Sequence, residues 1–521
     1  MTTRERPRRS TASPISFPSF ILALALLTVA IVGWRAVSSG THGTSTSVRG
    51  PGSGSSGSGL AAADDVTHNH AHGGSPMPGP INTKFPGITT FRGNATRTYY
   101  GEGPVPRNPR ILWQEPNHPM CASSTDPTGT RQWCGTGWTG QPNVIQHPDG
   151  SVEVREGAYD DHYHFWNGRT GQPTRPDLVT GDLAKGSATS DADGYPLYYG
   201  GSRDNYLRVI ALDRSAPTVL WQLDANHSVP TPMWNDDWDG APLQLGDYLL
   251  EGGENSWFYV IKLNRGYDAQ HKVTVDPKVV MRVPGWDAQE LRDIGDHDVS
   301  IENSVSFFDG VAYFANSGGL VQGWDISDVL RGGSHYQRVF RFWTGDDTDA
   351  SVVIDPSGYL YVASEIQRND ARSQQVGQIM KLDPSKPKDP EVWGVPVAEK
   401  GPDHLAGSWS TPALANGMVY VSTNYGDLLG IKQNTGRVTW RIHLQGPTWA
   451  SPVVVDGVLI EGDCAGRLHG FDVSNPRRQP KELWTVQLSG CIESTPAVWR
   501  GMIWVGARGG YFYGIGDAKS A

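Results

Sequence analysis

The chain has 521 residues, a formal net charge of −10 and only four cysteines. Glycine, tryptophan and tyrosine are abundant while long helical periodicity is absent, a combination typical of all-β proteins. The mildly acidic balance is compatible with plain solubility, and the lysines and arginines form no basic stripe. The composition therefore argues against a nucleic-acid partner and favours short strands joined by glycine-rich turns.

The N-terminus begins with a basic segment and continues into an apolar stretch from Ile15 to Trp34. The basic residues are Arg4, Arg6, Arg8 and Arg9. A run of roughly 20 apolar residues matches a bilayer-spanning helix, and positive charge before it keeps the N-terminus in the cytoplasm. We predict a cytoplasmic tail (1–14) and a transmembrane signal-anchor (15–35) that places the rest outside the cell membrane. A cleaved signal peptide and a secreted protein remain the alternative, because Ala36-Val37-Ser38 has the small residues of a cleavage site.

Residues 36–80 are rich in glycine and serine and are predicted to be a flexible linker. His68, His70 and His72 alternate within it. We interpret them as part of a disordered polar tether, with binding of a transition metal as the alternative.

The remaining residues, 81–521, contain a repeated hairpin. Its clearest copy has Asn416-Gly417 between two apolar runs and closes at Trp440, and Asn-Gly is the strongest short hairpin signal. The turn recurs at intervals of roughly 40 to 64 residues, as expected for four-stranded blades. Its copies are Asp149-Gly150, Asp193-Gly194, Gly246-Asp247, Asp309-Gly310, Ser357-Gly358, Asn416-Gly417, Asp456-Gly457 and Arg500-Gly501.

The last unit stops after its third strand, near Asp517, and the segment 109–113 ends in Trp113 like the missing fourth strand. Pairing of this N-terminal strand with the final unit would close a ring and remove exposed sheet edges. We therefore predict an all-β fold: an eight-bladed β-propeller with four-stranded antiparallel blades, preceded by an N-terminal transmembrane helix.

The four cysteines form two local pairs, Cys121 with Cys134 and Cys464 with Cys491. In an oxidising compartment they indicate two disulfides. A metal site is the weaker interpretation because neither pair has CxxC spacing. The second bridge would join two blades at the mouth of the channel.

Polar, charged and aromatic residues recur three positions before the residue that opens the first strand of a blade. They are Thr139, Asp239, Glu302, Asp349, Trp409, Trp449 and Glu493, and Lys185 lies near the equivalent place in the second blade. Because these segments lie on one face, we expect the side chains to converge around the axis. Close carboxylates bind a proton, a cation or a basic ligand, and indole rings supply a surface for stacking.

More acidic residues lie near these positions. They are Asp236, Asp237, Asp296, Asp298, Asp346, Asp347 and Glu254, the last of these next to Asn255. Such an oxygen-rich environment suits Ca²⁺. The alternative is structural, since acidic residues commonly cap turns in long loops.

The repeat units, above all Asn434–Trp440, resemble the Trp-docking repeats of the pyrroloquinoline quinone (PQQ) enzyme superfamily over most of residues 110–517. This family includes calcium-dependent quinoprotein alcohol dehydrogenases and cofactor-free propellers such as the scaffold lipoprotein of the outer-membrane barrel-assembly machinery. The resemblance implies that Asp349, in Gly345–Asp349, is the catalytic base of a dehydrogenase. It also implies Ca²⁺ ligands among Glu302, Asn303 and Asp349, and a PQQ site lined by the remaining axial residues.

Two features of those alcohol dehydrogenases are absent from the sequence. No two cysteines are adjacent, and no C-x-x-C-H haem motif is present, so electrons would need a separate acceptor. The leading interpretation is therefore a membrane-anchored extracytoplasmic propeller that binds a ligand or an envelope protein on its acidic and aromatic axial face. The alternative is a PQQ- and Ca²⁺-dependent dehydrogenase of an alcohol or sugar. A sensor ectodomain is disfavoured because residues 1–14 are too short for a signalling domain.

Overall fold

The computed structural model describes residues 77–126, 129–138, 140–397 and 406–518. The predicted tail, the transmembrane segment 15–35, nearly all of the linker and Thr139 lie outside these ranges. Within them, no helix has the length and apolar character needed to cross a membrane. The chain divides into two compact units, and the blades belong to the second, residues 62–124 with 131–521.

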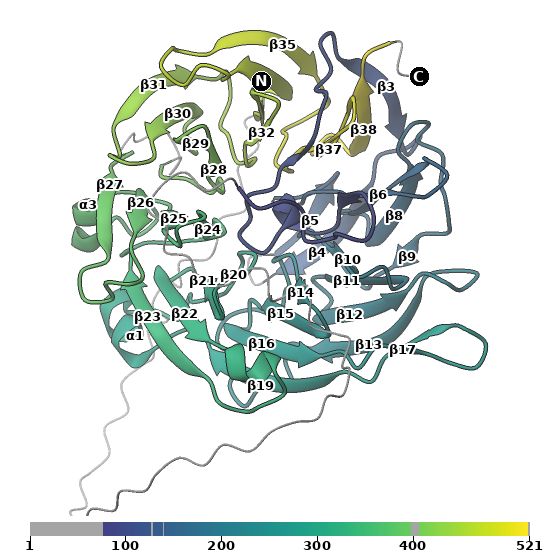
Figure 1. The fold of residues 1–521 in the computed structure, drawn as a ribbon, viewed down its shortest axis with the longest axis horizontal. Helices are drawn as coiled ribbons and strands as arrows, with labels where there is room; N and C mark the ends of the chain where they lie inside the picture. Colours follow the sequence, from purple (N-terminus) through teal and green to yellow (C-terminus); the bar gives the residue numbers. More distant parts are fainter. Residues whose placement is uncertain (1–76, 127–128, 139, 398–405, 519–521) are drawn as a thin grey trace, which may run out of the picture. The chain divides into compact units, whose positions relative to one another are not determined.

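Eight sheets form the propeller, and each contributes one blade of four strands. Figure 1 shows the blades following one another around an axis in chain order. The first contains β6 (Asn143–Gln146), β7 (Val152–Gly157), β8 (His162–Asn167) and β9 (Leu178–Val179). The second contains β10 (Thr189–Ser190), β11 (Leu197–Gly201), β12 (Tyr206–Ala211) and β13 (Thr218–Asp224). The third contains β14 (Leu243–Leu245), β15 (Tyr248–Gly252), β16 (Trp257–Lys262) and β19 (Lys278–Pro284). The fourth contains β20 (Ser306–Phe308), β21 (Val311–Phe314), β22 (Leu320–Asp325) and β23 (Gln337–Trp343).

The second half of the ring repeats this pattern. The fifth blade contains β24 (Val353–Ile354), β25 (Leu360–Ala363), β26 (Ile379–Leu382) and β27 (Glu391–Val395). The sixth contains β28 (Ala413–Ala415), β29 (Met418–Ser422), β30 (Asp427–Lys432) and β31 (Val438–His443). The seventh contains β32 (Val453–Val455), β33 (Val458–Gly462), β34 (Arg467–Asp472) and β35 (Lys481–Gln487). The eighth contains β36 (Ala497–Trp499), β37 (Met502–Ala507), β38 (Tyr511–Gly516) and β3 (Arg110–Glu115). The eight-bladed all-β prediction is thus confirmed.

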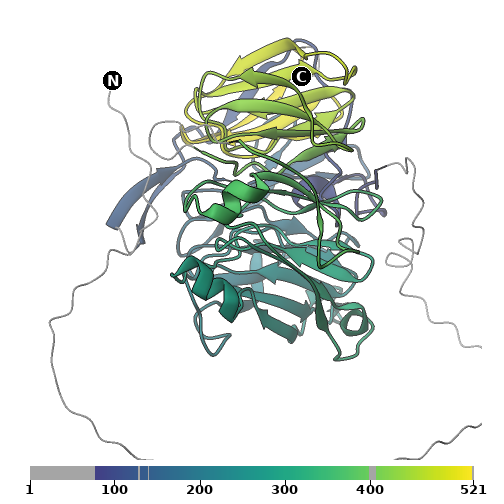
Figure 2. The same ribbon diagram turned by 90° about the vertical axis from the view of Figure 1, so that its left-hand side faces the viewer.

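Among the described residues, two hairpins and three short α-helices lie outside the four-stranded blades. Two hairpins stand outside the blades, β4 (Cys121–Asp126) with β5 (Gly129–Cys134), and β17 (Gly266–Tyr267) with β18 (Val273–Thr274). The short helices are α1 (Ala288–Ile294), α2 (Ser327–Leu330) and α3 (Ala371–Val376). Figure 2 shows α1 and α3 on the rim of the ring. The Asp287 side chain caps α1 by accepting from the N–H groups of Gln289 and Glu290.

Turn chemistry and close packing explain why the repeats form blades. All eight predicted turns join the first two strands of a blade, and Asn416 and Gly417 there adopt φ of 52° and 74°. In blades six, seven and eight, the fourth-strand tryptophan packs on a third-strand glycine. A Cβ atom on Gly430 would lie 2.1 Å from Cε2 of Trp440. Only glycine leaves room for the indole ring, so the Gly–Trp pair fixes the outer strand.

The eighth blade is completed by the N-terminal strand. β3 pairs antiparallel with β38, with Arg110 opposite Gly516 and Glu115 opposite Phe512. The packing of Trp113 on Gly514 repeats the Gly–Trp pair of blades six and seven, since a Cβ atom on Gly514 would lie 2.1 Å from the ring. The N-terminal strand thus covers the outer edge of β38 and gives the last blade its fourth strand.

The segment before β3, residues 79–105, follows the axis and binds the inner strands of the blades. We call it the axial segment. Its two short strands extend inner edges, β1 (Gly87–Ile88) on β6 and β2 (Gly101–Glu102) on β36. Between β1 and β2, carbonyl groups of the axial segment accept the N–H groups of Ser190, Phe307 and Ile354, which belong to blades two, four and five. The sequence contained no signal for this arrangement.

Two fully buried arginines extend the axial segment to the remaining blades. Arg92 donates to the carbonyl oxygens of Thr411, Pro412 and Pro452 at 2.6–2.8 Å. Arg97 donates to the carbonyl oxygen of Val305 and, at 3.3 Å, to that of Ala241. Burial lowers the pKa of Arg92 to about 10 and that of Arg97 to about 9, so both remain charged at neutral pH. The axial segment thereby contacts all eight blades.

Candidate functional site

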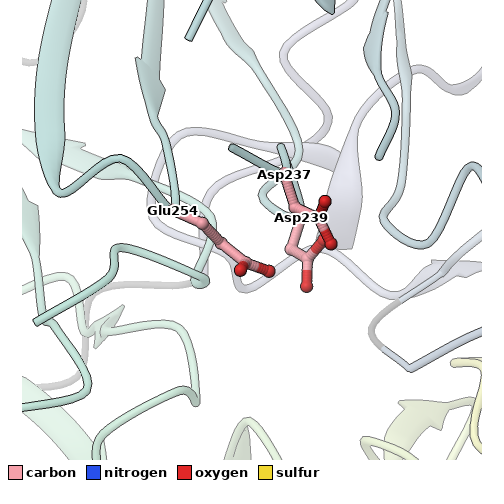
Figure 3. Close-up of side chains that lie close together, drawn as sticks. All are labelled: Asp237, Asp239 and Glu254. Carbon is pink, nitrogen blue, oxygen red and sulfur yellow. The ribbon is translucent and has the colours of Figure 1, made fainter. Parts of the chain in front are cut away.

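Lys185 lies among three acidic side chains in the third blade. Asp237 and Asp239 precede β14, and Glu254 follows β15. Figure 3 shows the carboxyl group of Glu254 directed toward that of Asp239, with Asp237 beside it. The Lys185 Nζ lies 2.7, 2.8 and 2.9 Å from oxygens of Asp237, Asp239 and Glu254. All three acids are buried, so the ammonium group offsets part of the negative charge of carboxylates that water scarcely reaches.

The electrostatics of this set depend on Lys185. Burial raises the pKa of Asp237 to about 6 and that of Asp239 well above its usual range, although Lys185 acts in the opposite direction. Burial also disfavours the charged form of Lys185, but Asp237 and Asp239 outweigh this effect and raise its pKa. Arg203 adds a second positive charge, with its Nε 3.2 Å from Asp237. The third blade therefore has a cation site filled by the protein's own lysine.

The same arrangement recurs two blades later. Asp347 and Asp349 precede β24, and Glu365 follows β25. Carboxylate oxygens of these three residues lie within 4.8 Å of one another, as they do for Asp237, Asp239 and Glu254. A local bond is also repeated, since Glu365 N–H donates to the Asp347 carbonyl at 2.7 Å and Glu254 N–H to that of Asp237 at 3.0 Å. Blade five thus contains a second buried three-carboxylate set of the same construction.

Glu302 was predicted to lie near Asp349, and the Ser317 hydroxyl connects the two carboxylates. The Ser317 hydroxyl lies 3.1 Å from Asp349 Oδ1 and 3.3 Å from Glu302 Oε1, and can bond either. Arg368 donates to the Ser317 carbonyl at 2.7 Å. Burial opposes the charge of Arg368, but Asp347 and neighbouring acids raise its pKa. Positive charge therefore also borders this set.

The side-chain amide of Asn303 is held by hydrogen bonds to the backbone. Its amide nitrogen donates to the Ala315 and Thr348 carbonyls at 2.8 and 3.1 Å, and its amide oxygen accepts the Ala315 N–H. The amide oxygen keeps a second lone pair, so the predicted role as a metal ligand does not require the loss of this backbone bond.

The predicted tryptophans meet, and a third joins them. The ring centroids of Trp409 and Trp449 lie 5.6 Å apart, and those of Trp138 and Trp409 lie 5.7 Å apart. The planes are tilted by 54° and 52°. Trp409 and Trp449 are partly exposed, so this cluster offers aromatic surface to a ligand.

Glu493 pairs with a residue that the sequence analysis missed. Arg508 Nη1 lies 3.0 Å from Glu493 Oε2, and its guanidinium packs over the rings of Trp133 and Tyr159. Glu254, Glu365 and Arg508 all follow the second strand of a blade. This recurring position is a signal that could have identified Glu365 and Arg508 beside the residues that precede the first strands.

Both predicted disulfides are present, Cys121–Cys134 and Cys464–Cys491. Cys464 follows β33 and Cys491 precedes β36, so the second bridge joins blades seven and eight. The cysteines are therefore structural crosslinks, and none is free within the described part of the chain.

A family model described as "Outer membrane protein assembly factor BamB" matches residues 375–479. Among solved structures, a europium-containing methanol dehydrogenase is similar with a TM-score of 0.57 and 13% identity, covering 84% of this chain and 99% of that one. The quinohemoprotein alcohol dehydrogenase from Comamonas testosteroni has a TM-score of 0.53 and 13% identity, with 83% and 81% covered. Sqt1 of Saccharomyces cerevisiae has a TM-score of 0.52 and 10% identity, with 78% and 98% covered. No curated protein matches the chain. At these identities the structural similarity shows the fold alone.

Proposed function

We propose that this chain, a β-propeller of the PQQ-like repeat family, binds a cationic ligand on its axial face at Asp347, Asp349 and Glu365. One observation carries the proposal: the same construction in blade three surrounds the ammonium group of Lys185. Buried carboxylates at this spacing are stabilised by positive charge. The set in blade five therefore suits a metal ion or an amine supplied by a ligand.

The tryptophan cluster supports the same proposal. Trp409 and Trp449 are predicted to face the axis with these acids, and both are partly exposed. Indole rings attract cations through their faces and also cover apolar surface. A ligand with a cationic group and a flat or apolar portion matches this combination of side chains.

Calorimetry of the full-length chain in detergent, with Ca²⁺ as the probe, tests this function. We expect saturable binding that is lost in the Asp347→Asn/Asp349→Asn double variant. The control Asp472→Asn changes an exposed turn carboxylate and should bind Ca²⁺ normally. Glu365→Gln alone provides a second, milder test if the double variant unfolds. Absence of Ca²⁺ binding by the intact chain, or equal binding by all variants, would contradict the proposal.

A PQQ- and Ca²⁺-dependent dehydrogenase is the second candidate. It is favoured by the place of Asp349, the predicted base, within a buried carboxylate set whose hard oxygens suit Ca²⁺. Asp347, Asp349 and Glu365 would hold the metal ion, and bound PQQ would accept the electrons of an alcohol. Glu302 and Ser317 would then hold a proton near Asp349, because the Ser317 hydroxyl lies within hydrogen-bonding distance of both carboxylates.

Quinone absorbance and alcohol-dependent dye reduction distinguish the two candidates. The full-length chain would be incubated with PQQ and Ca²⁺ and assayed with primary alcohols and sugars. Dye reduction that Asp349→Asn abolishes would establish the dehydrogenase. Ca²⁺ binding without PQQ uptake at saturating cofactor would favour the binding protein.

We also propose that residues 15–35 anchor the propeller on the outer side of the cell membrane. The support is the apolar run behind four arginines. The protein should stay with membranes after an alkaline carbonate wash, and deletion of 15–35 should release it. A mature N-terminus just after Ser38, detected by mass spectrometry, would instead show that the segment is a cleaved signal peptide.

A further inference from the structure

A cationic hollow lies on the face of the ring formed by the hairpin turns, where blades five, six and seven adjoin. Its volume is about 410 Å³, and Lys381, Lys432 and Arg477 line it. We propose that this hollow binds a small soluble molecule through a phosphate group. The site is separate from the axial residues, and the proposal does not depend on the function of that face.

Lys381 is the buried member of the three cations. Its side chain is 10% exposed, and its Nζ lies 4.0 Å from the ring centroid of Tyr359. Burial lowers the pKa of Lys381, against the raising effect of Asp355. The polar contacts of this ammonium group are long: its Nζ donates to the Gln433 carbonyl at 3.4 Å and lies 3.9 Å from Asp355 Oδ2. A phosphate group in the hollow would supply a closer anionic partner.

Asp355 is already engaged by other donors behind the hollow. Its Oδ2 accepts from the Tyr361 hydroxyl at 2.8 Å and from the Gln433 amide at 3.2 Å. Its Oδ1 accepts the backbone N–H groups of Ser357 and Tyr359. The carboxylate is therefore shared among several neighbours and only partly offsets the local positive charge.

Lys432 and Arg477 complete the charge of the hollow. Among the residues that the structure describes, neither has a carboxylate oxygen within 4 Å of its side-chain nitrogens. Three like charges facing one hollow repel each other, and an anion between them removes that repulsion. Arginine and lysine are the side chains that proteins use most for phosphate, through charge-assisted hydrogen bonds.

The walls of the hollow are held in place by turns. Asn416 and Gly417 form the β28–β29 turn, and the Gly417 carbonyl accepts the N–H of Gln433 at 3.0 Å. Liquid water occupies about 30 Å³ per molecule, so the volume admits a phosphate together with an attached group. The hollow is therefore preformed and large enough for a phosphorylated metabolite or a diphosphate.

Pyrophosphate is the probe for this site, titrated by calorimetry into the full-length chain in neutral detergent. We expect saturable binding that weakens at least tenfold in the Lys432→Gln/Arg477→Gln double variant and that decreases with added salt. The control Arg437→Gln removes an exposed charge of the same blade that does not line the hollow. Both changes in the double variant are at surface-accessible side chains, and circular dichroism would check its fold.

Two results would overturn the proposal. The first is no pyrophosphate binding by the intact chain at millimolar concentration, or binding that is equal in the double variant and the control. The second concerns the source of the phosphate. If phosphatidylglycerol added to the micelles displaces pyrophosphate from the intact chain, the hollow binds a lipid headgroup and not a soluble molecule.

Discussion

Replacement of Lys185 by methionine is a direct test of the buried charge cluster in blade three. The substitution keeps the length of the side chain but removes an ammonium group that lies within 2.9 Å of three carboxylates. Removing one partner of a buried ion pair typically costs about 3–5 kcal/mol. Because Lys185 is 16% exposed and Arg203 remains beside Asp237, we expect a loss near the lower end, about 3 kcal/mol, at neutral pH.

The loss should depend on pH in a defined direction. Without Lys185, the folded-state pKa values of Asp237 and Asp239, already raised by burial, rise further above those of the unfolded chain. The folded variant then binds more protons than the unfolded variant, so its stability falls as the pH rises from about 4 to 8. The penalty relative to the native protein should therefore be smaller at about pH 5 than at about pH 7.5.

Guanidinium unfolding followed by tryptophan fluorescence at these two pH values measures the effect. The control Lys386→Met removes an exposed lysine whose side chain is 68% accessible, and should change stability little. Adding Asp239→Asn to Lys185→Met should restore part of the loss, since one unpaired carboxylate is removed. A Lys185→Met variant as stable as the control at both pH values would refute the ion-pair assignment.

Three further predictions concern elements outside this cluster. Arg92→Met leaves three blade carbonyls without their donor and should lower the free energy of unfolding by at least about 3 kcal/mol, measured by guanidinium denaturation. His164, whose pKa its acidic partners raise to about 9 against the effect of burial, should contribute about 2–3 kcal/mol below pH 6.5 and lose it as the pH rises through 9. The His164→Gln variant should lack this pH dependence, and an unchanged profile would contradict the assignment. The Cys464→Ser/Cys491→Ser variant should lose about 3 kcal/mol, since the bridge closes a loop with a sequence separation of 27.

Local sequence signals were sufficient to predict the ring of eight blades. The glycine of each turn pair, such as Gly417 in Asn416-Gly417, has positive φ and recurs in all eight blades. Fourth-strand tryptophans that pack on a glycine, such as Trp440, recur in blades six, seven and eight. Alignment of the segments that precede the first strands also placed Glu302 near Asp349 and Trp409 near Trp449, and the structure has them close together. These features depend on short segments whose geometry is repeated.

Contacts between distant segments could not be derived in this way. Arg92 and Arg97 look like ordinary surface charges, and only the folded ring shows that the carbonyls of other blades surround them. Glu365 completes the blade-five set from a loop after β25, a position that the alignment of first strands does not sample. The backbone bonds of the Asn303 amide likewise depend on the folded blade, and composition and spacing do not reveal them.

The pairing of β3 with β38 has a consequence for the order of assembly. Residues 110–115 are synthesised some four hundred positions before their partners, residues 512–516, so the pairing of β3 with β38 cannot form until residues 512–516 have been made. Contacts between such remote segments slow folding, because a large loop must close before any pairing energy is gained. The early strand must therefore wait for residues 512–516, and Arg92 must wait for the carbonyl groups of Thr411, Pro412 and Pro452. Closure of the ring is therefore one late step, in which β3 from the first part of the propeller pairs with β38 from the last.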